Sequence, residues 1–152
     1  FDYWGLANLK RWEGDGSYDG TKLSADERDL QQFYQKLLSF SVISSAIVGE
    51  YADLHTHNIK QNPAYGERLY SFVRWSEKES VIVLSNFDEL KDFDSYLSIP
   101  KDLVNTLKIT PSSRLMNIFE DKNYKAIVDN QGNVRIDVSL KPLESIVLTF
   151  NQ

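Results

Sequence analysis

The feature of this sequence that most constrains its fold is a period-two alternation of apolar residues that begins near Arg68 and recurs to the end of the chain. A period of two is typical of strands that bury one face and expose the other. The clearest case is the segment 134–140, in which every second residue is Val, Ile or Leu and the residues between are Arg, Asp and Ser. Short strands at this spacing indicate a mainly β fold, an antiparallel β-sandwich of the Greek-key type.

Seven segments are expected to form the strands of this sandwich. They are 69–75, 81–84, 96–99, 107–109, 124–128, 134–140 and 146–150. The apolar run 81–84 predicts a central strand that is covered on both faces. The turn 129–133 predicts a hairpin between 124–128 and 134–140. No element is assigned to 112–121.

Ahead of the strands, one segment has the period of a helix. Ser24 and Glu27 have the spacing of a capping box, which predicts that the helix begins there. The apolar residues then recur at i, i+3, i+4, i+7 and i+8, and they are Leu30, Phe33, Tyr34, Leu37 and Leu38. A helix with a single apolar stripe must pack against something to be stable. We therefore expect an amphipathic helix ahead of the sandwich.

The sequence divides near Ser44, where the composition changes. We expect two parts, 1–44 and 45–152, the first an irregular aromatic stretch plus the helix and the second the β-sandwich. The chain begins at Phe1 with neither Met nor an apolar targeting segment, so we expect it to be a piece of a longer protein. Its compartment is therefore left undetermined.

Composition excludes several classes of protein. The chain of 152 residues has no cysteine, which excludes disulfide scaffolds, thiolate nucleophiles and zinc–thiolate sites. Its 17 basic and 22 acidic residues give a net charge of −5, and without a basic cluster we expect no nucleic-acid partner. No apolar run approaches the ~20 residues of a membrane span.

Two motifs could hold a metal. His55 and His57 would share one face of a strand and could grip one ion, but no third ligand is marked, so we expect solvated loop histidines. The segment Asp15–Gly20 resembles the start of a calcium loop, with Asp15, Ser17 and Asp19 as ligands, but the closing Glu is missing. We expect a plain turn there, no metal site and no cofactor.

The tryptophans are the remaining candidates for function. Trp4 and Trp12 crowd the start of the chain, and Trp75 ends an expected strand. Burying a large aromatic side chain is worth roughly 2–3 kcal/mol, so exposed ones are costly unless they dock on something. We expect docking on protein for the N-terminal pair. Trp4, Trp12 and Trp75 are also the candidates for stacking on sugar rings.

The order of these segments resembles the C-terminal end of alpha-amylase-family glycoside hydrolases. The segments that carry the resemblance are Phe1–Leu9, Asp19–Ser24, Leu30–Leu38, Ser45–Tyr51, Arg68–Arg74, Val81–Phe87 and Leu140–Leu148. In that family such a sequence implies the last helix of a (β/α)8 barrel, followed by a β-sandwich called domain C. The resemblance covers nearly the whole chain and is weakest between 112 and 123.

The resemblance brings no catalytic residue to this chain. Family members hold their acidic residues on earlier barrel strands, and the nearest imitation here, Gly132–Asp137, has the wrong spacing and lies in an expected hairpin. The resemblance therefore implies a non-catalytic domain of an enzyme that acts on α-glucans such as starch or maltodextrin. Its partner would be the missing catalytic barrel of the same polypeptide, and an α-glucan is a further candidate partner.

Two other functions remain open from the residues alone. A stand-alone carbohydrate-binding β-sandwich module would use the tryptophans to hold glucan. An independent small hydrolase would need a pair of carboxylates that the sequence does not mark, since spacing in space decides such a pair.

Overall fold

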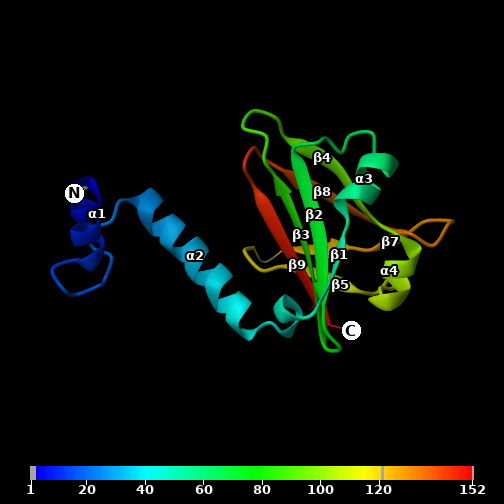
Figure 1. Ribbon diagram of the computed structural model, residues 1–152, viewed down its shortest axis with the longest axis horizontal. Coiled ribbons are helices and arrows are strands. Elements are labelled where there is room, and N and C mark those ends of the chain that lie inside the picture. Colours follow the sequence, from blue (N-terminus) through cyan, green and yellow to red (C-terminus); the bar gives the residue numbers. More distant parts are fainter. Residues whose placement is uncertain (1–2, 121, 152) are drawn as a thin grey trace. The chain divides into compact units, whose positions relative to one another are not determined.

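The computed structural model describes residues 3–120 and 122–151, apart from the side chains of Tyr3, Trp4 and Asn151. It divides into two compact units, Phe1–Ser39 and Phe40–Gln152, which are described separately (Figure 1). The second unit is a sandwich of two antiparallel sheets, which confirms the predicted fold class.

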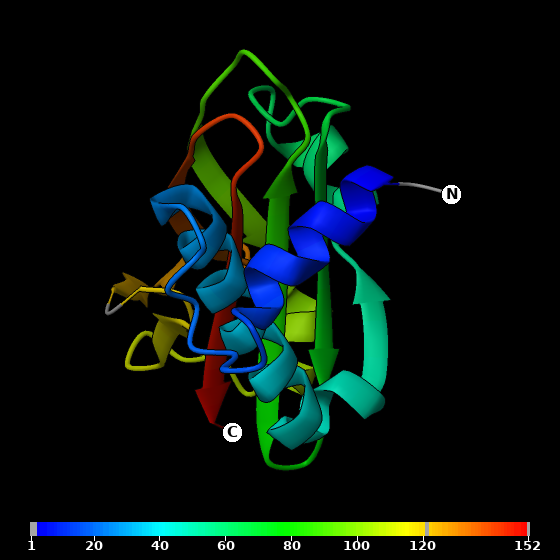
Figure 2. The same cartoon turned by 90° about the vertical axis from the view of Figure 1, so that its left-hand side faces the viewer.

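The larger sheet has six strands in the order β1-β2-β3-β9-β5-β6. They are β1 (Glu50–Asp53), β2 (Leu69–Trp75), β3 (Glu79–Asn86), β9 (Ser145–Asn151), β5 (Arg114–Asn117) and β6 (Asn123–Lys125). Figure 2 shows β1 at the edge beside β2. The smaller sheet has the order β4-β8-β7, with β4 (Phe93–Ile99), β8 (Val134–Leu140) and β7 (Ile127–Val128).

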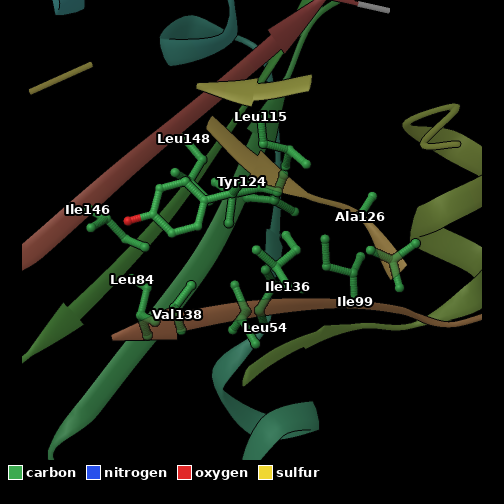
Figure 3. Packing of buried hydrophobic residues seen from close by; sticks show 14 of the residues in the cluster. Leu54, Leu84, Ile99, Leu115, Tyr124, Ala126, Ile136, Val138, Ile146 and Leu148 are labelled. Carbon is green, nitrogen blue, oxygen red and sulfur yellow. The ribbon is translucent and has the colours of Figure 1, made fainter. Parts of the chain in front are cut away.

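The main hydrophobic core lies between the two sheets. Along β8 the four apolar residues are buried and the three polar residues between them are exposed, as the alternation predicts. Side chains from both sheets, among them Leu148, Tyr124 and Ile136, point toward one another (Figure 3). Burial of this face drives the two sheets together.

A second, smaller cluster covers the outer face of the large sheet. Ala46, Val81 and Val147 are its buried members, and Phe40 packs against them. Ala46 belongs to the 3₁₀ helix η1 (Ser45–Val48), which follows directly on the helical segment. Because Val81 and Ile82 are both fully buried on opposite faces of β3, the predicted central strand is confirmed.

The predicted amphipathic helix is α2 (Ala25–Ile43), and its capping box is formed as expected. The Ser24 amide donates to Glu27 Oε2 at 2.8 Å, and the Glu27 amide donates to Ser24 Oγ at 3.2 Å. The prediction of an irregular stretch before it is wrong, because α1 (Tyr3–Glu13) is a helix. Its middle, Leu6–Arg11, consists mostly of strong helix formers, and Leu6, Leu9 and Trp12 recur at the spacing of a helix.

Two further predictions are corrected by short helices. The expected loop at the histidines is α3 (His55–Gln61), whose first amides donate to the Asp53 carboxylate at 3.0 Å. The expected strand 107–109 is instead the turn that follows α4 (Lys101–Thr106). Leu107 and Ile109 are both buried on either side of exposed Lys108, so a helix-ending turn has the same alternation as a strand.

The predicted hairpin 124–128/134–140 is only partly correct. Of its first arm, β7 alone pairs with β8, whereas β6 pairs with β5 in the other sheet. The chain therefore changes sheets at buried Ala126, between β6 and β7. Strand β5 lies in the segment that the sequence left unassigned. Within 3–120 and 122–151, the helices are too short or too polar to cross a membrane.

Candidate functional site

A cavity of about 730 Å³ opens in the sandwich unit where three segments meet. We call it the Trp75 cavity, and its lining residues are Gly49, Glu50, Trp75, Ser76, Glu77, Thr106 and Lys108. They come from the start of β1, the turn between β2 and β3, and the end of α4, which are labelled in Figure 1. Its volume falls within the ~300–1,000 Å³ that is usual for small-molecule sites.

Trp75 is the aromatic wall of the cavity and the last residue of β2. The indole is partly buried and packs against the main core, so its position is fixed by the sandwich. Glu50 of β1 lies opposite Trp75 in the antiparallel pair of β1 and β2. A Cβ on Gly49 would lie 2.0 Å from the Trp75 carbonyl oxygen, so only glycine lets the chain enter β1 this close to Trp75.

The β2–β3 turn forms the second wall and is held by Ser76. Its amide donates to the Glu79 carbonyl oxygen at 2.9 Å, and its Oγ accepts the Lys78 and Glu79 amides at 3.2 and 3.3 Å. The same Oγ lies 2.7 Å from Ser45 Oγ in η1. This bonding fixes the turn and leaves Glu77 exposed beside the cavity.

Behind this wall, Glu79 ties η1 to β3. Its Oε1 accepts hydrogen bonds from Ser44 Oγ at 2.7 Å, Ser45 Oγ at 3.2 Å and the Ala46 amide at 3.2 Å. Burial alone would raise the pKa of the Glu79 carboxyl, but these donors stabilise the carboxylate and leave its pKa lowered. The charged form is therefore the one that fastens η1.

The third wall is the end of α4, which closes in a Schellman turn. The Ile109 amide donates to the Val104 carbonyl at 3.0 Å, and the Lys108 amide donates to the Asn105 carbonyl at 3.3 Å. Lys108 has φ 54°, in the left-handed region where glycine is usual. The turn holds Thr106 and Lys108 at the cavity, with Thr106 Oγ1 donating to the Asp102 carbonyl at 2.9 Å.

The cavity offers an aromatic surface beside charged and hydroxyl groups that can form hydrogen bonds. It combines an indole with two carboxylates, an ammonium group and a hydroxyl. A glycosidase general acid sits in an apolar pocket that shields it from water. Glu50 and Glu77 are both exposed. Both carboxylates can accept hydrogen bonds from a polar ligand and stay partly solvated.

Of the three sugar-stacking candidates, Trp75 belongs to the unit that holds this cavity. Trp75 lines it, whereas Trp12 belongs to α1 in the other unit, where it is 46 % exposed and meets Tyr18 edge-to-face at 5.5 Å. Trp4 also belongs to α1, and its side chain lies outside the described part of the structure. The sequence named the aromatic wall and missed the polar residues around it.

The prediction of solvated loop histidines is wrong. Both lie on α3, where residues i and i+2 point to different sides, so they do not share a face. His57 Nε2 lies 3.1 Å from Ser98 Oγ, and burial lowers the pKa of this histidine. His55 Nδ1 lies 3.4 Å from the hydroxyl of Tyr65. Each ring is thus a packed, hydrogen-bonded part of the sandwich.

The candidate calcium loop is a turn in the first unit. Asp19 Oδ1 accepts from the Thr21 amide at 3.0 Å and from Thr21 Oγ1 at 2.8 Å, while the Asp15 carboxylate pairs with Lys22. These bonds close the turn on itself through one oxygen of each carboxylate. In the part of the chain that the structure describes, no group of three or more His, Cys, Asp or Glu residues is arranged to hold a metal.

A second exposed group of aromatic residues lies at the edge of the large sheet and was not predicted. Tyr51 of β1 is 49 % exposed and Tyr70 of β2 is 40 % exposed, and their hydroxyl oxygens are 2.9 Å apart. Phe72 lies beside both, with ring centroids 5.8 and 5.9 Å away. The Tyr70 hydrogen bond raises the pKa of Tyr51 to about 12, with burial adding to the effect.

No protein-family model matches the chain, and no curated protein sequence matches it. Among solved structures, it is similar to AmyP, an alpha-amylase-family enzyme, in complexes with maltotriose and with maltose. Both comparisons give 18 % identity and a TM-score of 0.57, and they cover 86 % and 88 % of this chain. The trehalulose synthase MutB from Pseudomonas mesoacidophila MX-45 aligns over 78 % of this chain and 17 % of its own, at 17 % identity and a TM-score of 0.45.

The match covers only 22 % and 23 % of the two AmyP chains, so this chain spans less than a quarter of the length of that protein. At this identity the likeness is one of fold. The chain has the fold of a segment of an alpha-amylase-family enzyme, as the resemblance in its sequence implied.

Proposed function

We propose that this chain is a non-catalytic, C-terminal supporting domain of an alpha-amylase-like glycoside hydrolase. In this proposal, residues 1–44 end the catalytic barrel and residues 45–152 are the sandwich that packs beside it. The fold likeness to AmyP supports the proposal, since it extends over most of this chain and less than a quarter of that enzyme.

The observation that carries the proposal is the apolar stripe of α2. This helix has 19 residues, none of them buried. Leu30, Tyr34 and Leu38 are each more than half exposed, and Phe33 is 38 % exposed. Fully burying one such side chain is worth roughly 1.5–3 kcal/mol, so further burial of Leu30 and Tyr34 against a second surface would stabilise the helix. A barrel on the same polypeptide is the partner that the fold likeness supplies.

The substrate class follows from the same likeness. AmyP is seen with maltose and with maltotriose, both short α-glucans. We infer that the parent enzyme acts on α-glucans such as starch or maltodextrin. The exposed settings of Glu50 and Glu77 support a sandwich that takes no chemical part in cleavage.

An activity assay on the 152-residue chain tests the non-catalytic part of this proposal. The purified chain is incubated with a chromogenic α-glucoside and with maltotriose, and no turnover above buffer is expected. Turnover that Glu50→Gln or Glu77→Gln abolishes, and that the matched exposed variant Glu67→Gln leaves intact, would establish an independent hydrolase and overturn the proposal.

A further inference from the structure

We infer that the Trp75 cavity is a binding site for a short, neutral α-glucan, with one glucose ring lying against the Trp75 indole. The choice of an α-glucan rests on the proposed function. The choice of an uncharged sugar rests on the cavity itself.

The residues around the indole supply what a sugar ring needs. A glucose ring has apolar C–H faces, which suit an aromatic surface, and a rim of hydroxyl groups that both donate and accept. Glu50 and Glu77 accept from hydroxyls, and Lys108 donates to them. Thr106 Oγ1 already donates to the Asp102 carbonyl, so its lone pairs are directed to an incoming donor.

The charges of the cavity select against other ligands of the same size. Two carboxylates and one ammonium group line it, which disfavours a phosphate or another anion. A compact cation would meet the Lys108 ammonium group on the same lining. A polyhydroxylated neutral ligand can use both kinds of group at once.

The cavity is also formed before a ligand arrives. Gly49 fixes the approach of β1 to Trp75, Ser76 fixes the turn that bears Glu77, and the Schellman turn fixes Lys108. Lys108 occupies a left-handed backbone position that favours glycine, although no glycine is present there.

The test is an NMR titration of the ¹⁵N-labelled 152-residue chain with maltotriose. The indole N–H signals of the three tryptophans report on binding. We expect the Trp75 signal to shift and saturate, while the signals of Trp4 and Trp12 stay in place. No shift at Trp75 at millimolar maltotriose overturns the inference. A shift of Trp75 with phosphate or tetramethylammonium but not with maltotriose overturns it as well.

Variants connect the signal to the cavity. Trp75→Ala should abolish binding but removes core packing too, so two rim variants carry the test. Glu77→Gln and Lys108→Gly should each weaken maltotriose binding about tenfold, the effect of one lost charged hydrogen bond. Glu67→Gln and Lys60→Ala, exposed residues away from the cavity, should bind like the unchanged chain.

Lys108→Gly is the sharper of the two because it relieves the left-handed backbone. Its melting temperature should not fall, so weaker binding could not come from unfolding. Unchanged affinity in both rim variants overturns the inference. Hydrolysis of maltotriose by the chain would contradict the proposed function and not the glucan site. No hydrolysis together with an unshifted Trp75 signal would overturn only the glucan site.

Discussion

Strand β8 and helix α2 have equally clear apolar patterns and opposite surroundings. In β8 every second residue is apolar, and all four of these residues are at most 3 % exposed. In α2 the apolar stripe has the spacing of an amphipathic helix, yet none of its residues is buried. The apolar pattern therefore predicts which face of an element is to be buried, and it does not predict what buries that face.

The two elements differ in what buries their apolar residues. The partner of β8 is the large sheet, made from strands on both sides of it in the sequence. At the end of α2, Phe40 packs against the cluster over β3, while Leu30 is 56 % exposed. We propose that the rest of the α2 stripe packs on protein outside these 152 residues.

The largest expected effect comes from shortening a core residue. Ile136→Ala removes a fully buried side chain from β8 and should cost about 2–5 kcal/mol of the free energy of unfolding. Leu38→Ala, at a position 60 % exposed, should change it by less than about 0.5 kcal/mol in the same chain. Urea denaturation of both variants checks this. Similar losses would mean that the α2 stripe is already buried in solution.

A smaller effect is expected where α2 joins the sheet. Glu79→Gln removes the charge that fastens Ser44 and Ala46 and should cost about 1–2 kcal/mol. Because folding lowers the pKa of Glu79 below its ordinary 4.5, this stabilisation is complete above pH 4.5 and is lost as the pH falls through the folded value. The stability gap between the two proteins should therefore close below about pH 4.5. A gap that stays constant down to pH 3 would show that the carboxylate does not fasten η1.

The smallest effect should be confined to the first unit, Phe1–Ser39. Ser24→Ala removes one half of the capping box of α2 and should cost about 0.5–2 kcal/mol of local helix stability. Amide hydrogen exchange should become faster in the first turns of α2 and stay unchanged in β8 and β9. Faster exchange throughout the sandwich would show that the two regions unfold together.

The sequence predicted the elements that carry a clear local signal. The alternation of β8, the doubly covered run in β3 and the capping box of α2 are each local signals, and the structure has all three. The sheet order could not be predicted in the same way. It places β9 between β3 and β5. Strand β3 lies about 60 residues before β9 in the sequence and β5 about 30 residues before it, and no local pattern encodes pairing over such distances.

The wrong predictions have physical reasons that can be named. The buried residues Leu107 and Ile109 alternate like a strand because a Schellman turn reverses the chain between them. Short α3 depends on the Asp53 carboxylate rather than on an apolar period. In α1, Leu6, Leu9 and Trp12 recur at the three-residue spacing of a helix, a short period that is easily overlooked among the neighbouring glycines and charges.

The candidate site was predictable only in its aromatic residue. Trp75 could be singled out because an indole at a strand end is costly to expose. Glu50, Glu77 and Lys108 come from three segments, and nothing in their local sequence distinguishes them from other surface charges. The topology that brings β1, the β2–β3 turn and α4 together is what makes them a site.

The central claim is that the stripe of α2 packs on a barrel of the same polypeptide. The most direct test measures the loss of unfolding free energy caused by Phe33→Ala twice, once in the 152-residue chain and once in the longer enzyme that the proposal requires. We expect a loss larger by about 1 kcal/mol in the longer enzyme, because the part of the Phe33 ring that is 38 % exposed in this chain would be buried there. Equal losses in the two proteins would contradict it.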